Sequence, residues 1–338
     1  MKRAGETAAA VTEKNGLASG LDQTLRPQSW EEYVGQEKVK ENLRILLTAA
    51  RGREQAAEHI LLYGPPGLGK TTLAHLIATT LGTNMRVTSG PAIERVGDLA
   101  AILTNLTPGD ILFIDEIHRL SKAVEEVLYP AMESGVLDII LGKGPSARTV
   151  QLDLPPFTLV AATTRISLLS APLRSRFSGG TFRLDFYTDE EIAAILTRSA
   201  GLLGMQAARE TLATIASRSR ATPRTGNYLL KRCRDLAQLE NAGISEDVVS
   251  RTFALLDIDT RGLHGPDRAL LRAIVQKFAG GPVGLNTLAA ATGEEMATIE
   301  DVLEPYLIRQ GLIERTPRGR VATAAAHEHL GQQKSTLL

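Results

Sequence analysis

The sequence contains a single cysteine, Cys233, so an internal disulfide and a zinc site built on several cysteines are both excluded. It also lacks any stretch approaching the roughly 18 consecutive apolar residues that a membrane-spanning helix requires. The first twenty residues have no apolar core of the kind found in signal peptides, and their composition is typical of a mobile polar arm. Together these absences lead us to expect a cytoplasmic protein without a membrane partner.

The chain has no excess charge of either sign, because 38 lysines and arginines balance 38 aspartates and glutamates. Net charge therefore neither favours nor excludes a nucleic-acid partner, and any contact with DNA must come from a local basic patch. One such patch lies at residues 309–320, which contain four arginines and one acid, Glu314. The length of 338 residues leaves room for two or three domains.

Short apolar runs alternate with amphipathic stretches between about Leu25 and Phe186. The runs are HILLY (59–63), MRVTS (85–89), DILFID (110–115) and TLVAATT (158–164), and turn residues or a helical pattern follow each. This alternation predicts a parallel sheet with helices on both faces. Within the same region, residues 137–154 have two strand-like arms around GKGPSA, which predicts an inserted β-hairpin.

Two further regions follow this α/β region. Residues 187–259 carry apolar side chains at three- and four-residue spacing, which predicts a small helical bundle. In residues 260–331, LNTLAAAT, GEE and ATIEDVLEPYLIRQ predict helix, tight turn and helix, and LIERTPRGRVAT predicts two strands joined at Pro317-Arg318-Gly319, a wing. We therefore expect an α/β domain at 22–186, a helical domain and a winged-helix domain, flanked by an arm (1–21) and a tail (332–338).

A phosphate-binding motif stands between the first predicted strand and a predicted helix. GPPGLGKT (64–71) matches G-x-x-x-x-G-K-[ST] in full. Its glycines let the backbone point successive N–H groups at phosphates, Lys70 brings a positive charge to the β- and γ-oxygens, and the Thr71 hydroxyl is a ligand for Mg²⁺. A loop that only connects strand to helix is the alternative, and the flanking elements argue against it.

Two acids and two threonines end other predicted strands. DILFIDEIHRL places Asp115 and Glu116 at the carboxyl end of a buried strand, where α/β sheets hold their sites. Asp115 would hold Mg²⁺ through water, and Glu116 would polarise the attacking water. An isolated Asp-Glu pair is more often a solvated strand end, but this one follows the P-loop by about forty residues. Thr163 and Thr164 could orient water or sense the γ-phosphate, although bonding to the backbone is the ordinary role of such hydroxyls.

Two arginines in APLRSRF, Arg174 and Arg176, are the last candidates of this region. An arginine from a neighbouring subunit can neutralise the charge on a transferring phosphoryl group. A surface ion pair of little energetic value is the alternative, and the residues alone leave the two readings even.

The order GPPGLGKT, LFIDEIHRL, AATT, LRSRF and TPR before a helical domain is the pattern of AAA+ ATPases. More specific segments, among them LRPQSWEEYVGQEKVKENL, GGPVGLNTLAAATGEE and TIEDVLEPYLIRQGLIERTPRGRVAT, resemble the RuvB family of bacterial Holliday-junction branch-migration motors over about residues 22–330. The resemblance implies ATP and Mg²⁺ as cofactors and a homohexameric ring around duplex DNA of any sequence. It also implies docking on RuvA at the four-way junction, with the RuvC resolvase as a further partner, in DNA recombination and repair.

The resemblance also assigns roles to single residues. The catalytic group would be Asp115, Glu116, Thr164 as first sensor and Arg176 as the finger that reaches into the neighbouring subunit's site. The hairpin would meet RuvA, and Arg224 in ATPRTG would be the second sensor. The residues that would bind ATP are Leu25, Arg26, Gly67, Gly69, Lys70, Thr71, Thr72, Glu133, Ser134, Gly135, Tyr187 and Arg224, with Mg²⁺ at Thr71 and Asp115, and those that would touch the DNA backbone are Arg315, Arg318 and Arg320.

Three segments depart from the family pattern. Ser134 and Gly135 stand where an acidic and an aromatic residue are usual, and FSGGTFRLDF (177–186) is one residue longer and rich in glycine. ATPRTGNYLL lacks the usual leading glycine and the Ile-Ala before its asparagine, and Gly226 inside a predicted helix should cost about 1 kcal/mol relative to alanine. These departures leave open whether the activity is altered.

Two other functions remain open on the residues alone. A clamp-loader-type AAA+ switch shares the P-loop, the acid pair and the SRF arginine, but it would not carry a C-terminal winged helix. A DNA-binding regulator with a vestigial nucleotide site is the other, and intact Lys70, Glu116 and Arg176 argue against it.

Overall fold

The computed structural model describes residues 23–141 and 148–331. The predicted arm, the GKGPSA segment of the hairpin and the tail lie outside the described residues. Contacts divide the chain into two compact units. Of the described residues, the first unit holds those from 23 to 191 together with Thr222–Arg224, and the second holds Ile192–Ala221 together with residues 225–331.

Five parallel strands form the sheet of the first unit, in the order β2-β3-β6-β1-β7. β6 lies between β1 and β3, with Thr163 level with Tyr63 of β1, so the carboxyl ends of these strands share one edge of the sheet. The predicted parallel α/β fold is confirmed. The strands are β1 (Ile60–Tyr63), β2 (Met85–Ser89), β3 (Ile111–Asp115), β6 (Thr158–Thr163) and β7 (Gly180–Arg183).

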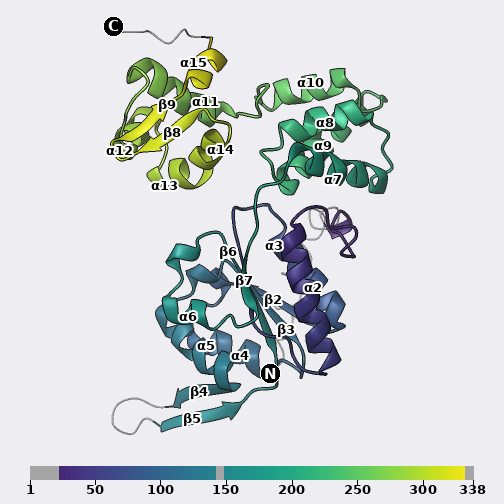
Figure 1. The fold of residues 1–338 in the computed structure, drawn as a ribbon, viewed down its shortest axis with the longest axis vertical. Helices are drawn as coiled ribbons and strands as arrows, with labels where there is room; N and C mark the ends of the chain where they lie inside the picture. Colours follow the sequence, from purple (N-terminus) through teal and green to yellow (C-terminus); the bar gives the residue numbers. More distant parts are fainter. Residues whose placement is uncertain (1–22, 142–147, 332–338) are drawn as a thin grey trace, which may run out of the picture. The chain divides into compact units, whose positions relative to one another are not determined.

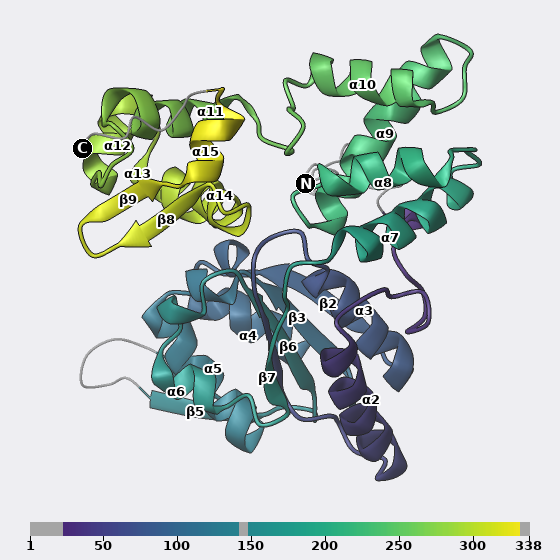
Figure 2. The same ribbon diagram turned by 45° about the horizontal axis from the view of Figure 1, so that its top comes forward.

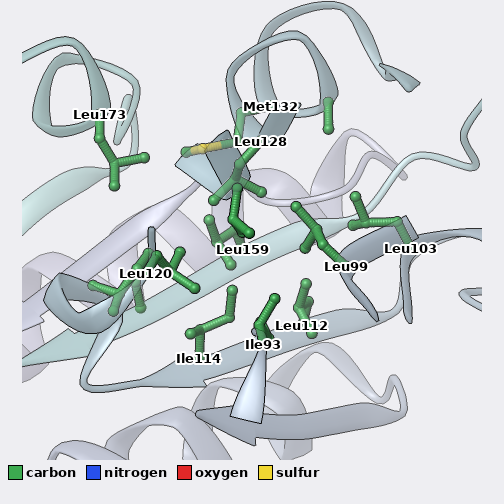
Figure 3. Packing of buried hydrophobic residues seen from close by; sticks show 14 of the residues in the cluster. Ile93, Leu99, Leu103, Leu112, Ile114, Leu120, Leu128, Met132, Leu159 and Leu173 are labelled. Carbon is green, nitrogen blue, oxygen red and sulfur yellow. The ribbon is translucent and has the colours of Figure 1, made fainter. Parts of the chain in front are cut away.

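Helices cover both faces of this sheet (Figure 1, Figure 2). α3 (Lys70–Leu81) packs on β3 and β6 and against α2 (Glu37–Gly52). Leu112 of β3 and Leu159 of β6 belong to an apolar cluster with side chains of α4, α5 and α6, which Figure 3 shows from close by. Alternate residues of a strand point to opposite faces, so the continuous run ILFI supplies apolar side chains to both layers. The remaining elements are α4 (Val96–Thr104), α5 (Lys122–Ser134), α6 (Ala171–Ser175) and the short turns η1 (Gly90–Ala92), η2 (Ile117–Arg119) and η4 (Ile166–Leu168).

A β-hairpin separate from the main sheet is inserted between α5 and β6. Its strands, β4 (Val136–Leu141) and β5 (Arg148–Asp153), run antiparallel with Val136 opposite Asp153. The two strand-like arms predicted from residues 137–154 are thus confirmed. Val150 and Leu152, on the same face of β5, are exposed apolar side chains.

The sequence pattern does not predict the edge strand β7. Its residues, GTFR, include one large apolar side chain, which is too short a pattern to predict a strand. Gly179, just before it, donates its N–H to the carbonyl oxygen of His59 at 2.9 Å, and a Cβ added there would lie 2.8 Å from the carbonyl oxygen of Glu58. The glycine-rich departure from the family pattern therefore lets this strand approach β1.

A bundle of four helices follows the α/β region. Its buried side chains include Ile192, Leu196, Leu229 and Phe253, as the helical periodicity predicts. The helices are α7 (Asp189–Leu202), α8 (Arg209–Ser217), α9 (Pro223–Leu239) and α10 (Glu246–Leu255).

Gly226 lies in α9, where its backbone packs closely on α7. A Cβ added to it would lie 3.1 Å from Cγ2 of Ile192 and 3.4 Å from Cδ2 of Leu196. Alanine would gain about 1 kcal/mol of helix propensity, but overpacking typically costs about 1–3 kcal/mol. We therefore expect Gly226→Ala to leave the thermal unfolding midpoint unchanged or to lower it.

Thermal unfolding followed by circular dichroism measures this effect. Gly201→Ala, in α7, is the matched control, because among the described residues no atom outside its chain neighbours and the backbone of its own helix lies within 4 Å of the added Cβ. The control should raise the midpoint through helix propensity alone. An equal rise in both variants would show that the close packing of Gly226 has no energetic consequence.

The last region is a winged helix. Its helices enclose one apolar core that includes Leu270, Leu288 and Leu307. The two strands pair antiparallel, with Pro317 and Arg318 alone between them, so the predicted wing is confirmed. The elements are α11 (Gly265–Arg272), η5 (Ala273–Lys277), α12 (Leu285–Thr292), α13 (Met296–Thr298), η6 (Ile299–Leu303), α14 (Glu304–Arg309), β8 (Ile313–Thr316), β9 (Gly319–Ala322) and α15 (Ala324–His329).

The second helix of this motif is interrupted where the sequence predicts a continuous helix over 297–310. Ile299–Leu303 form a π-helical turn directly before Glu304 and Pro305. Proline has no N–H for the helical ladder, and its ring crowds the carbonyl group four residues earlier. A wider turn before Pro305 relieves that clash. Among residues 23–141 and 148–331, no helix is both long and apolar enough to cross a membrane.

Candidate active site

The loop between β1 and α3 has a backbone that favours glycine. Gly64, Gly67 and Gly69 have φ angles of +143°, +81° and +97°. At Gly64 an added Cβ would also lie 2.4 Å from the carbonyl oxygen of Leu184. Because α3 begins at Lys70, the first N–H groups of that helix, which have no partner within it, face the loop. This arrangement is suited to binding an anion.

Lys70 lies folded against this loop and is only 7% exposed. Its Nζ donates to the carbonyl oxygens of Gly64 at 2.8 Å and Pro65 at 2.9 Å. Burial lowers the pKa of Lys70, and the charges of Glu116 and Asp115 oppose that shift. An ammonium group bonds more strongly to an anionic oxygen than to a neutral carbonyl, so a phosphate in the loop would compete well for Lys70.

Asp115 ends β3, and Glu116 follows it with a left-handed backbone, φ +49°. Such a conformation costs about 1–3 kcal/mol for a residue other than glycine and is characteristic of functional sites. Gly90 makes room for it, because a Cβ added there would lie 2.4 Å from the carbonyl oxygen of Glu116. Burial, followed by the charge of Glu116, raises the pKa of Asp115.

The carboxylate of Glu116 is bonded to the end of β6. Thr164 donates to its Oε2 from the backbone N–H at 3.2 Å and from the hydroxyl at 3.0 Å. Nδ1 of His118 lies 3.1 Å from the same oxygen and 2.9 Å from the hydroxyl oxygen of Thr163. The sequence carries no signal for His118, because its contact with Thr163 joins residues 45 positions apart. The structure thus joins Glu116 to Thr164, and the role of Thr164 as a sensor stays a prediction.

Two buried tyrosines form hydrogen bonds to the backbone of the P-loop. The hydroxyl groups of Tyr33 and Tyr187 lie 3.3 Å and 3.2 Å from the carbonyl oxygen of Leu68. Burial raises the pKa of Tyr187 to about 12 and that of Tyr33 well above its usual value, so both stay protonated at neutral pH. Tyr187 is a predicted site residue, whereas Tyr33 belongs to no motif, so the sequence does not predict its place in the site.

Arg224, at the start of α9, belongs to the same unit as the P-loop. Its N–H donates to the carbonyl oxygen of Gly67 at 3.4 Å, and its Cβ lies 3.2 Å from a Cβ built on Gly67. Arg26 is placed along α3, with Nη1 2.8 Å from Nε2 of His75, and Leu25 beside it is buried. Thr71 and Thr72 are half-buried in the first turn of α3.

Arg176 lies with Glu133, Ser134 and Gly135, a group of predicted site residues near the end of α5. It forms an ion pair with Glu133 at 3.0 Å, and its guanidinium carbon lies 4.4 Å from the centre of the Tyr129 ring. Ser134 and Gly135 follow Glu133 at the end of α5, where Gly135 caps the helix with φ +65°. Within the described part of the chain, none of the contacts of Arg176 is with the P-loop, Asp115 or Glu116 of its own chain.

The three predicted DNA-contacting arginines differ in exposure. Arg318 is exposed in the two-residue turn of the wing, and Arg315 is half-exposed and paired with Glu300. Arg320 is only 8% exposed, and its guanidinium group is paired with Glu304, with Nη2 3.1 Å from Oε2. The sequence predicts three surface arginines, whereas a DNA contact from Arg320 would require the pair with Glu304 to open.

The residues present fit a magnesium ion better than a metal that needs a full protein cage. Within the described ranges, no three His, Cys, Asp or Glu residues gather in a way that could hold a metal. Mg²⁺ usually takes one or two protein oxygens together with substrate phosphates and water. The hydroxyl of Thr71 and the carboxylate of Asp115 are oxygen donors of this kind, at the start of α3 and the end of β3, which pack together.

The fold and the site define a class of protein. A glycine-rich loop after β1, an acid pair after β3 and a threonine after the intervening β6 make the first unit a P-loop domain of the AAA+ type. Family models match nearly the whole chain: the Holliday junction DNA helicase RuvB P-loop domain at 25–184, the RuvB AAA lid domain at 187–259 and the RuvB C-terminal winged helix domain at 260–331. The chain belongs to the RuvB family.

Solved structures of Thermotoga maritima RuvB resemble the chain over almost its whole length. The structure described as the Thermotoga maritima RuvB Holliday junction branch migration motor is 50% identical, with a TM-score of 0.83, and the match covers 92% of this chain and 99% of that one. A proline-to-glycine mutant of the same protein is also 50% identical, with a TM-score of 0.83 and coverage of 91% and 99%. The winged helix and the family membership both disfavour the clamp-loader alternative.

Proposed function

We propose that the chain is an ATP-driven DNA translocase that works as a homohexameric ring, pumps duplex DNA and drives branch migration of Holliday junctions in recombination and repair. The observation that carries this proposal is the bond between Glu116 and Thr164 beside an intact P-loop, in a chain whose wing ends in an exposed arginine. A vestigial site would not need the strained backbone of Glu116. We expect the motor to act in the cytoplasm.

ATP would lie over the P-loop, with its base and ribose against Leu25, Arg26 and Tyr187. The phosphates would meet the loop N–H groups, Lys70 and the first turn of α3, and Arg224 would reach the γ-phosphate. Thr71 and, through water, Asp115 would hold Mg²⁺, which when bound neutralises charge that develops on the phosphates.

Hydrolysis requires a base that orients water, and the geometry of Glu116 suits this role. Thr164 and His118 fix Oε2, whereas Oε1 has no hydrogen-bond partner among the described residues. Oε1 is therefore the oxygen that would accept the proton of the attacking water. Because the Thr164 hydroxyl already donates to Glu116, a γ-phosphate would compete for it, which is how Thr164 would act as a sensor.

Arg176 would act on the ATP of the neighbouring subunit. Within its own chain, Arg176 pairs with Glu133 and lies over the ring of Tyr129, both at or near the end of α5. Arg176 therefore lies next to residues 133–135, which are also predicted to bind nucleotide. An arginine held in place beside other predicted nucleotide-binding residues could belong to the surface that completes the ATP site of the neighbouring subunit. The ring requirement follows, because an isolated subunit would lack this charge.

The wing would contact the DNA backbone through Arg318 and Arg315, which lie on its exposed part. Phosphate contacts position a protein on DNA without reading its sequence, as a translocating motor requires. RuvA would dock on the hairpin, where the exposed Val150 and Leu152 offer an apolar strand face. RuvC as a further partner rests on the family resemblance.

Glu300 competes with DNA for Arg315, so removing its charge should tighten DNA binding. An exposed ion pair is worth about 0.2–1 kcal/mol, so Glu300→Gln should tighten binding by a factor of about 1.4 to 5 at low salt. The dependence of log affinity on log salt should steepen by up to about one unit if Arg315 gains a phosphate. Fluorescence anisotropy of labelled duplex DNA over a salt series measures both.

Glu314→Gln is the matched control, because Glu314 lies on the same wing and no arginine pairs with it within the described ranges. The control alters net charge equally and should have a smaller effect. Equal tightening by both variants would reduce the effect to bulk charge and would remove the specific role of Glu300.

The proposed function is tested by ATP turnover with different DNA and protein ligands. Turnover should rise when a synthetic four-way junction and RuvA are added. Stimulation by a ring-shaped clamp in place of the junction would favour the clamp-loader alternative, and absence of turnover under every condition would favour the regulator.

A further inference from the structure

The connection between α8 and α9 has an unusual backbone. Two consecutive non-glycine residues, Arg220 and Ala221, have φ angles of +54° and +56°. A left-handed backbone costs about 1–2 kcal/mol per residue of this kind, so it persists only where the surroundings hold it. Ser219 and Ala221 are buried, which fixes the turn within the second unit.

The side chain of Arg220 is held by residues of the winged helix. Its Nη1 pairs with Oδ2 of Asp267 at 2.6 Å, and its Nη2 donates to the carbonyl oxygen of Val302 at 3.1 Å. Its guanidinium carbon lies 4.4 Å from the centre of the Tyr306 ring. A single arginine of the helical bundle thus contacts both α11 and the helix that carries the π-helical turn.

The partners of Arg220 are themselves fixed in place. Asp267 is fully buried and also accepts the N–H of His264 at 2.9 Å, so it caps the start of α11. The Tyr306 hydroxyl donates to the carbonyl oxygen of Arg261 at 2.7 Å. A displacement of Arg220 would therefore leave a buried carboxylate without its counter-charge, which is strongly unfavourable.

The same turn leads directly into the proposed second sensor. Arg224 follows Arg220 by four residues and lies against Gly67 of the P-loop. Between them stand Ala221, buried Thr222 and Pro223, whose ring restricts φ. A shift of Arg224 would be passed along a short, stiff segment rather than absorbed by a flexible loop.

From this arrangement we infer that Arg220 is a positioning residue that couples the nucleotide-sensing Arg224 to the DNA-binding winged helix. The inference rests on the proposed function, because it identifies the residue that would transmit the nucleotide state of the motor to its DNA-binding domain. Among the described residues, no hydrogen bond or ion pair joins Arg220 to the P-loop or to a wing arginine, so its loss should separate ATP hydrolysis from DNA movement rather than abolish hydrolysis.

The test compares ATP turnover and branch migration in the full-length protein with RuvA on a synthetic four-way junction. For Arg220→Ala we expect basal ATP turnover and ATP affinity within about twofold of the unmodified protein. Branch migration per ATP hydrolysed should fall by about 5- to 150-fold, the range that coupling between sites typically spans. Stimulation of the ATPase by DNA should also fall, because the same contacts of Arg220 would carry the effect of bound DNA back to Arg224.

Three further variants keep the outcome decisive. Arg251→Ala removes an ion-paired arginine of the same helical bundle and should leave the migration-to-hydrolysis ratio unchanged. Asp267→Asn keeps a capping group of the same shape but removes the charge, and it should reproduce the uncoupling. If Arg220→Ala does not fold, Arg220→Lys, which keeps the charge but loses the forked geometry, should show the same split.

Two results would overturn the inference. One is a parallel fall of hydrolysis, migration and thermal stability, which a merely structural role predicts. The other is an unchanged ratio of migration to hydrolysis in every folded Arg220 variant. Failure of the proposed function looks different, because the unmodified protein itself would then not move the junction.

Discussion

Glu116→Gln should lower ATP turnover by about 10²- to 10⁴-fold, the usual contribution of a positioned base. The amide has nearly the shape of the carboxylate and can still bond to Thr164, but its oxygen cannot take a proton from water. ATP binding should persist, because Lys70 and the loop N–H groups are untouched. Steady-state phosphate release and binding of a fluorescent ATP analogue measure the two quantities separately.

Glu126→Gln, an exposed glutamate on α5, is the control for the loss of one negative charge. It should leave turnover unchanged. If Glu116→Gln binds ATP and hydrolyses it within about twofold of the unmodified protein, a range far smaller than general-base catalysis contributes, another group must orient the water.

Arg176→Ala should lower ATP turnover by about 10³- to 10⁵-fold, the range that an arginine finger contributes. The expected cause is the loss of a positive charge at the neighbouring subunit's γ-phosphate. Arg174→Ala is a closely matched control, because Arg174 is exposed, stands two residues earlier in the same segment and has no ion pair within the described ranges. It should have little effect. Equal losses in both variants would mean that the segment acts through its overall charge.

Mixed rings test whether the site is shared between subunits. Lys70→Ala lacks its own phosphate-binding charge but keeps Arg176, and Arg176→Ala has the opposite defect. In an equal mixture about a quarter of the interfaces of a cyclic ring join an intact P-loop to an intact finger, so activity should reappear. A mixture that assembles, as sedimentation would show, but stays inactive would place Arg176 outside the neighbour's site.

The parts of the fold that the sequence predicts are those with a local signal. β1, β3 and β6 are buried parallel strands, so they appear as continuous apolar runs, and the wing is marked by a proline and a glycine at its turn. β7 is missed because it has one large apolar residue and is specified by the backbone of β1. The π-helical turn before Pro305 is missed because periodicity does not separate it from an α-helix.

The candidate site divides in the same way. Lys70, Asp115, Glu116 and Thr164 stand at fixed places in motifs, and the sheet order brings their strand ends together. Tyr33 and Arg220 have roles set by partners far along the chain, at Leu68 and Asp267. The burial of Arg320 depends on Glu304, sixteen positions away, and the alternating pattern of the wing does not reveal that partner.

The central claim is that ATP cleavage in this site moves duplex DNA through a four-way junction. The most direct measurement is conversion of a synthetic labelled junction into two duplexes, followed on a native gel with ATP and RuvA present. We expect ATP-dependent conversion by the unmodified protein and none by Glu116→Gln. Vigorous ATP hydrolysis with no conversion above the level seen without this protein would contradict it.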